Sequence, residues 1–126
     1  MKYIYIALGG TIGALLRYGV SGLTYRYFDG VFPWGTLAVN LSGCFAIGFL
    51  WAISEQVILS AHFKPFVLVG IIGAYTTFST FSLETFHLLR DKEIKMALVN
   101  VLASNILGIG LVFLGFVLAN LIFKRG

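Results

Sequence analysis

Residues 73–86 read GAYTTFSTFSLETF and alternate hydroxyl side chains with phenylalanines. Hydroxyl groups donate hydrogen bonds to anions or ligate cations through oxygen, and the edge of an aromatic ring carries partial positive charge. On a helix that advances about 100° per residue, polar groups then lie on every side of this segment. A span that is polar on every side cannot face lipid, so we expect other protein segments to enclose it and an ion path to run beside it.

The rest of the chain is apolar enough to embed this segment in a membrane. Hydrophobic residues make up 59% of the sequence, charged residues 11%, and the mean hydropathy is +0.94. A helix needs ~20 mostly apolar residues to cross the hydrocarbon. Such stretches occur at residues 3–24, 34–54, 65–89 and 96–123. We predict an all-α membrane protein in which residues 1–126 form a single, multi-pass, four-helix transmembrane domain.

Two glycines precede the polar run, within Gly70-Ile-Ile-Gly73-Ala-Tyr-Thr76. Their position predicts a third helix that is broken near its middle, between Gly73 and Thr76. Breaks at membrane depth are tolerated where they line a cavity, and the freed backbone carbonyls then serve as ion ligands. The alternative is that both glycines only let another helix approach closely.

The distribution of basic residues bears on orientation. With four spans, the side that holds both termini carries Lys2, Lys64, Lys124 and Arg125, and the other side carries Arg26, Arg90, Lys92 and Lys95. Because an excess of Lys and Arg on one side normally sets orientation, this even count predicts insertion in both directions. The natural assembly is then an antiparallel homodimer with a two-fold axis in the membrane plane. The alternative is a single orientation, restored by one or two charges that lie deeper.

Three costly polar residues lie inside predicted spans and are candidate site residues: Arg17, Asn40 and Glu84. Asn40 fits an interhelical hydrogen bond or a functional amide equally well. For Arg17 we weigh a structural role on helix-end carbonyls against a vestibule role, in which a fixed positive charge concentrates anions.

Catalysis is not expected, because His62 and His87 lack partners at ligand spacing and the third-span hydroxyls lack a nearby base. Two other classes stay open from the residues alone. A small dual-topology multidrug or cation exporter would use Glu84 as its intramembrane carboxylate, and a structural membrane assembly subunit would use none of these groups. The lipid bilayer is the expected environment, and no nucleic acid partner is expected.

Three motifs together resemble the Fluc (CrcB-type) fluoride channels. The first is G-x-x-T-T-F-S-T-F-S-x-E at Gly73 to Glu84, the second is GTLAVN at Gly35 to Asn40, and the third is Gly9-Gly10-x-x-Gly13 followed by Arg17. The third-span motif is long and chemically unusual, and the resemblance covers essentially the whole chain. The fourth span departs from the family pattern, because it has Asn100, Ser104 and Gly108 where a fuller ladder of hydroxyl or tyrosine side chains is expected.

The resemblance implies a fluoride-selective channel that exports fluoride passively across the plasma (inner) membrane and so lowers cytoplasmic fluoride and its toxicity. It implies an antiparallel dual-topology homodimer with two pores and a central structural sodium ion that is not transported. Main-chain carbonyls of Gly73 and Thr76 from each protomer would hold that ion. The implied fluoride path falls on Asn40, Phe78, Ser79, Thr80, Phe81 and Ser104. The groups left as vestibule or structural polar residues are Arg17, Thr36 and Glu84.

Overall fold

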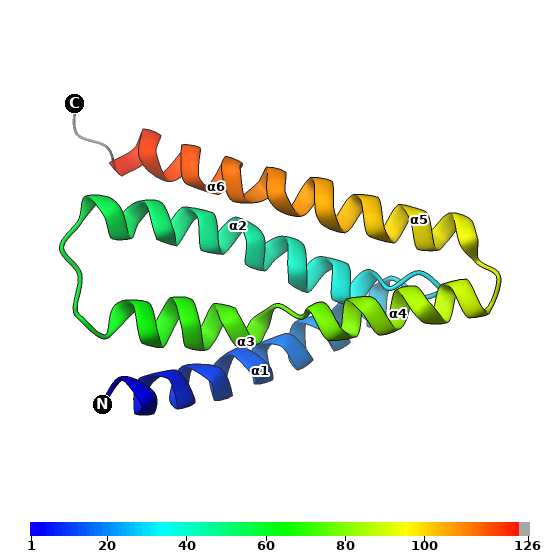
Figure 1. Ribbon diagram of the computed structural model, residues 1–126, viewed down its shortest axis with the longest axis horizontal. Helices are drawn as coiled ribbons and strands as arrows, with labels where there is room; N and C mark the ends of the chain where they lie inside the picture. Colours follow the sequence, from blue (N-terminus) through cyan, green and yellow to red (C-terminus); the bar gives the residue numbers. More distant parts are fainter. Residues whose placement is uncertain (124–126) are drawn as a thin grey trace.

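The computed structural model describes residues 1–123, and long helices dominate it (Figure 1). Four helical segments are long and apolar enough to cross a membrane: Lys2–Tyr27, Trp34–Gln56, Lys64–Arg90 and Ile94–Phe123. They run back and forth along one long axis with short connections (Figure 1). The prediction of an all-helical chain with four candidate membrane spans is therefore confirmed.

The first two spans are continuous α-helices. Helix α1 covers Lys2–Tyr27 and α2 covers Trp34–Gln56. The connection between them turns at Gly30, whose φ of 128° is readily adopted only by glycine. Pro33 immediately precedes α2, where its missing N–H leaves no helical hydrogen bond unmade.

The third span consists of three helical pieces with one interruption. The π-helical segment η1 (Lys64–Ile72) runs directly into α3 (Gly73–Tyr75), and α4 (Phe78–Arg90) follows after two extended residues, Thr76 and Thr77. The predicted break near the middle of this helix is thus present.

Its position differs from the expectation, because Gly73 is helical, with φ −59° and ψ −38°, and the extended geometry begins at Thr76. Gly70 has another use: a side chain there would collide with the backbone of Gly9 in α1. Gly70 therefore permits helix contact, and polar contacts of Thr77 hold the break.

The fourth span is unbroken but changes its winding. Helix α5 (Ile94–Leu102) continues into the π-helical segment η2 (Ala103–Leu107) and then into α6 (Gly108–Phe123). A π-helical turn closes hydrogen bonds between residues five apart instead of four, so it rotates the side chains that follow it.

Small residues allow the spans to pack closely in two pairs. Helix α2 lies along α6, and α1 lies along η1 and α3. A Cβ at Gly48 would strike the backbone of Val112, and one at Gly115 would strike the backbone of Phe45. On the other side of the molecule, Gly9 and Gly13 have the same relation to the third span. Close backbone approach at small residues is how helices associate in lipid.

The connections place the basic residues at the two ends of the molecule. The N-terminus, the connection from α2 to η1 and the end of α6 lie at one end, and the other two connections lie at the opposite end (Figure 1). Lys2 and Lys64 therefore lie at the first end, and Arg26, Arg90, Lys92 and Lys95 at the other. Lys124 and Arg125, which complete the even count, lie outside the described residues.

Candidate functional site

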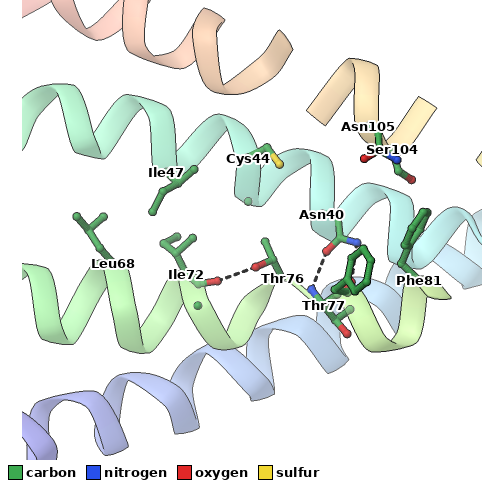
Figure 2. A pocket seen from close by; sticks show the side chains of 13 residues that line it. Asn40, Cys44, Ile47, Leu68, Ile72, Thr76, Thr77, Phe81, Ser104 and Asn105 are labelled. Carbon is green, nitrogen blue, oxygen red and sulfur yellow. Dashed lines mark hydrogen bonds between the residues drawn. The ribbon is translucent and has the colours of Figure 1, made fainter. Parts of the chain in front are cut away.

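A cavity of about 370 Å³ opens beside the interruption, where the second, third and fourth spans meet (Figure 2). Six of the site residues expected from the sequence line it: Asn40, Gly73, Thr76, Phe78, Phe81 and Ser104. They come from α2, the third span and η2, so only the folded arrangement brings them together.

Asn40 clamps the extended backbone at the interruption. Its Oδ1 accepts from the Thr77 N–H at 2.8 Å (Figure 2). Its Nδ2 donates to the Thr77 carbonyl at 3.0 Å. The side-chain amide thus pairs with both backbone groups of one residue. A buried backbone group without a partner is costly, so this pair stabilises a break that would otherwise be unfavourable. One N–H of the Asn40 amide remains for other partners.

The interruption also redirects two backbone N–H groups away from the third span's own carbonyls. In a continuous α-helix, the carbonyls of Gly73 and Thr76 accept from the N–H groups of Thr77 and Thr80. Here the Thr77 N–H donates to Asn40, and the Thr80 N–H donates to Thr77 Oγ1 at 3.2 Å, as an N-cap of α4. Both carbonyls therefore lose their α-helical partners, and both residues lie at the cavity.

Two phenylalanines of α4 differ sharply in exposure. Phe81 is 9% exposed, whereas Phe78 is 78% exposed. Their ring centroids are 5.7 Å apart with planes tilted by 44°, so the rings pack against each other. A phenylalanine in mid-span can be exposed to lipid at little cost, but this one lies at the mouth of a cavity that also contains polar groups.

A second cavity, of about 270 Å³, lies on the other side of the interruption and is lined by Arg17, Thr36 and Thr80 among others. Arg17 Nε donates to the carbonyl of Ala74 at 3.1 Å, which is the structural contact that the sequence allowed for it. Thr36 is buried in this wall. Thr77 lines both cavities, so the Asn40–Thr77 pair stands between them.

Two further expected residues lie away from the main cavity. Glu84 lines a smaller cavity of about 150 Å³, where its Oε2 accepts from the Tyr25 hydroxyl at 3.3 Å. Its Oε1 is buried, and no hydrogen-bond partner for it is found among residues 1–123. Ser79 is exposed, with its hydroxyl 3.4 Å from that of Thr77.

Among the further residues that line the cavity, three have a polar or thiol side chain: Thr77, Cys44 and Asn105. Thr77 belongs to the polar run, but the position of the glycines predicted a break at the residues before it. Asn105 was missed for a different reason. The small-residue face of the fourth span repeats every four residues, at Asn100, Ser104 and Gly108, and Asn105 lies outside that repeat unless the helix changes its winding.

A buried polar network links the third and fourth spans beside the cavity. Asn100, 2% exposed, donates through Nδ2 to Thr85 Oγ1 at 3.0 Å, and the Thr85 hydroxyl donates to the carbonyl of Phe81 at 2.8 Å. Ser104 lies 3.5 Å from Asn100 Oδ1. The network therefore connects a cavity residue of η2 to the backbone that carries Phe81.

Comparison with known proteins gives consistent matches over most of the chain. The model of the family described as "CrcB-like protein, Camphor Resistance (CrcB)" matches residues 4–116. A protein of Salinibacter ruber named "Fluoride-specific ion channel FluC" is 50% identical over 115 residues, covering 91% of this chain and 86% of its own. Proteins of the same name from Desulforapulum autotrophicum and Thermus thermophilus are 47% and 43% identical, over 96% and 91% of this chain and 98% and 92% of their own.

Proposed function

The chain belongs to the CrcB-like family of fluoride-specific ion channels, and on that premise we propose that its fluoride path runs through the cavity beside the interrupted third span. The chain is thus a membrane fluoride channel and not an enzyme. The observation that carries the assignment of the path is the meeting of Asn40, Phe78, Phe81 and Ser104 around one cavity.

The chemistry of these groups suits a small, strongly hydrated anion. The remaining N–H of Asn40, the Ser104 hydroxyl and the positive edges of the two rings replace part of the hydration shell of fluoride. None of them carries a full charge, so the anion is held weakly enough to leave again, as conduction requires. Ser79 and Thr80 extend the path toward the second cavity, where Arg17 and Thr36 form a vestibule that attracts anions.

We propose that a structural sodium ion, which is not transported, is held by the main-chain carbonyls of Gly73 and Thr76. The donor set fits, because both carbonyls lose their α-helical partners and carbonyl oxygen is a ligand that hard cations prefer. The ion would supply fixed positive charge that keeps these carbonyls in place. The carbonyl of Ala74, between them, already accepts from Arg17.

We propose that two copies assemble as an antiparallel, dual-topology homodimer with two pores in the plasma (inner) membrane. Support comes from Phe78 and Gly73, which are exposed at the cavity in the single chain although they lie in mid-span. A partner would cover this surface, enclose each path and bring four carbonyls to one ion. Export through it is passive, down the fluoride gradient, and lowers cytoplasmic fluoride and its toxicity.

The two other classes considered from the sequence lose their support. Because the chain belongs to the channel family, we propose neither a multidrug exporter nor an assembly subunit. The position of Glu84 also argues against an exporter that uses this carboxylate. Glu84 lies in a side cavity, where it accepts a hydrogen bond from Tyr25, and not in the main cavity. Its role is structural or at a pore mouth.

Fluoride release from liposomes that contain the purified protein tests the proposed path, with chloride release as the control. Wild-type protein should release fluoride and retain chloride, and Phe81→Ala and Phe78→Ala should each slow fluoride release. Unchanged release in both variants would move the path elsewhere, and equal release of chloride would contradict a fluoride-specific channel. Replacing sodium with a large organic cation on both sides tests the ion separately, since release should then stop.

Orientation has its own test. A single cysteine added after residue 126, in a Cys44→Ala background, should be labelled by an impermeant reagent from both sides of the membrane. Labelling from one side only excludes dual topology but leaves the fluoride path untouched.

A further inference from the structure

The fourth span presents one amide to the main cavity that the expected fluoride path does not include. Asn105 lies in η2 and lines the cavity next to Ser104, while Asn40 lines it from α2 (Figure 2). The two asparagines therefore belong to different spans and to one cavity.

Asn105 lies within the π-helical segment η2, directly after Ser104. A residue that follows directly on Ser104 would lie about 100° further round a regular α-helix. In η2 both Ser104 and Asn105 line the same cavity. π-Helical segments are rare and occur frequently at functional sites.

The hydrogen bonds of the two asparagines differ in what they leave free. Asn40 uses its Oδ1 and one N–H on the backbone of Thr77. Asn105 donates one N–H to the carbonyl of Val101 at 2.8 Å, which fixes the amide on its own helix. Its second N–H remains as a donor. Because Asn105 is exposed in the single chain, that donor is the more accessible of the two.

The location of Asn105 argues against a purely packing role. An amide in the middle of a span is costly in lipid and usually faces a bundle interior or a water-filled cavity. The flanking residues Ile106 and Leu107 are also exposed, so packing does not demand a polar group here.

We propose that Asn105 is a second amide donor to the transported anion and, with the Ser104 hydroxyl, forms a fluoride subsite on the fourth span. This inference rests on the proposed path through the main cavity. Fluoride accepts hydrogen bonds more strongly than chloride but is also more strongly hydrated, so donors from two spans favour fluoride by replacing part of its hydration shell. Asn40 then both clamps the interruption and offers its remaining N–H to the ion, and Asn105 is the second amide that meets it.

The test is fluoride release from liposomes containing wild-type protein, Asn105→Leu, Asn105→Asp or Asn105→Ser. Leucine and ionised aspartate lack N–H donors, so both variants should release fluoride about tenfold more slowly, as expected for one lost hydrogen bond to a charged group. Serine keeps a donor and should restore part of the rate. A purely structural residue would not raise the fluoride concentration that gives half-maximal flux, and we expect both leucine and aspartate to raise it.

Asn120→Leu is the matched control, because Asn120 lies in the same span but bonds to Gln56 away from the cavity. It should release fluoride at the wild-type rate. Wild-type release from Asn105→Asp, measured at a pH that keeps the carboxylate ionised, would overturn the subsite even if the leucine variant fails to fold, and would leave the proposed path standing. If the wild-type protein releases no fluoride, the proposed function fails instead.

Discussion

The third and fourth spans each contain a π-helical segment, η1 and η2, but only the third span is also interrupted. The third span is interrupted at Thr76 and Thr77, which are extended, whereas the fourth keeps its helix and only changes its winding in η2. The interruption redirects backbone hydrogen bonds and so offers carbonyls. The π-helical segment keeps its backbone bonded and offers side chains.

The contacts that hold the two irregular segments in place differ as well. Polar contacts hold the interruption: the amide of Asn40, the Thr77 cap and the guanidinium of Arg17. The fourth span lies on α2 through close backbone approach at Gly48 and Gly115. The third-span wall of the cavity therefore depends on specific hydrogen bonds, and the fourth-span wall depends on close packing against α2.

Asn40→Leu should have the largest effect, because it removes the clamp of the third span. Leucine has a similar volume but leaves the N–H and carbonyl of Thr77 unpaired, at about 1–3 kcal/mol each. We expect fluoride release from liposomes to fall by about 100-fold, which corresponds to roughly 2.7 kcal/mol, and the thermal midpoint in detergent to fall as well. A protein with wild-type release would show that the interruption does not need this clamp.

Gly115→Ala tests the other wall and should act mainly on stability. The added methyl group would meet the backbone of Phe45 and Phe49 in α2, and overpacking of this kind costs about 1–3 kcal/mol. We expect a lower thermal midpoint, with fluoride still preferred over chloride. Gly110→Ala is its control, since a Cβ there meets no atom within 4 Å, and its midpoint should stay near that of the wild type. Equal effects of both variants would argue against close packing as the support of the fourth span.

Thr77→Val should have the smallest effect of the three, because it keeps the backbone pair with Asn40 and removes only the cap of α4. The Thr80 N–H then loses its acceptor, at a cost of about 1 kcal/mol. We expect release to slow by less than about tenfold. Thr77→Ser retains the hydroxyl and should behave as the wild type. If valine is as damaging as Asn40→Leu, the cap holds the interruption as strongly as the clamp does.

The sequence predicted the four spans and the broken third helix, because length, apolar composition and two glycines are local signals. It placed the break too early. Glycine indicates where a helix can break, but the clamp on Thr77 comes from Asn40, 37 residues away, and such a contact exists only after folding. The sequence left two alternatives for Arg17, a structural contact with helix-end carbonyls and a vestibule role. The hydrogen bond from Arg17 to the Ala74 carbonyl is the first of these.

The fourth-span wall was less predictable. A repeat of four residues assumes regular α-helical winding, and under that assumption Asn105 lies off the face marked by Asn100 and Ser104. Asn105 lines the cavity from the π-helical segment η2, and residues 103–107 carry no recognised sequence signal for such a segment. An amide outside the expected face was the one sign that could have pointed to it.

The most direct test of the central claim uses Cys44, which lines the main cavity and is the only cysteine in the sequence. A small, water-soluble mercurial that reacts with this thiol would fill part of the cavity, and mass spectrometry measures how much protein has reacted. We predict that fluoride release from liposomes stops in proportion to modification, while Cys44→Ala protein conducts before and after treatment. Undiminished release from fully modified wild-type protein would contradict a fluoride path through this cavity.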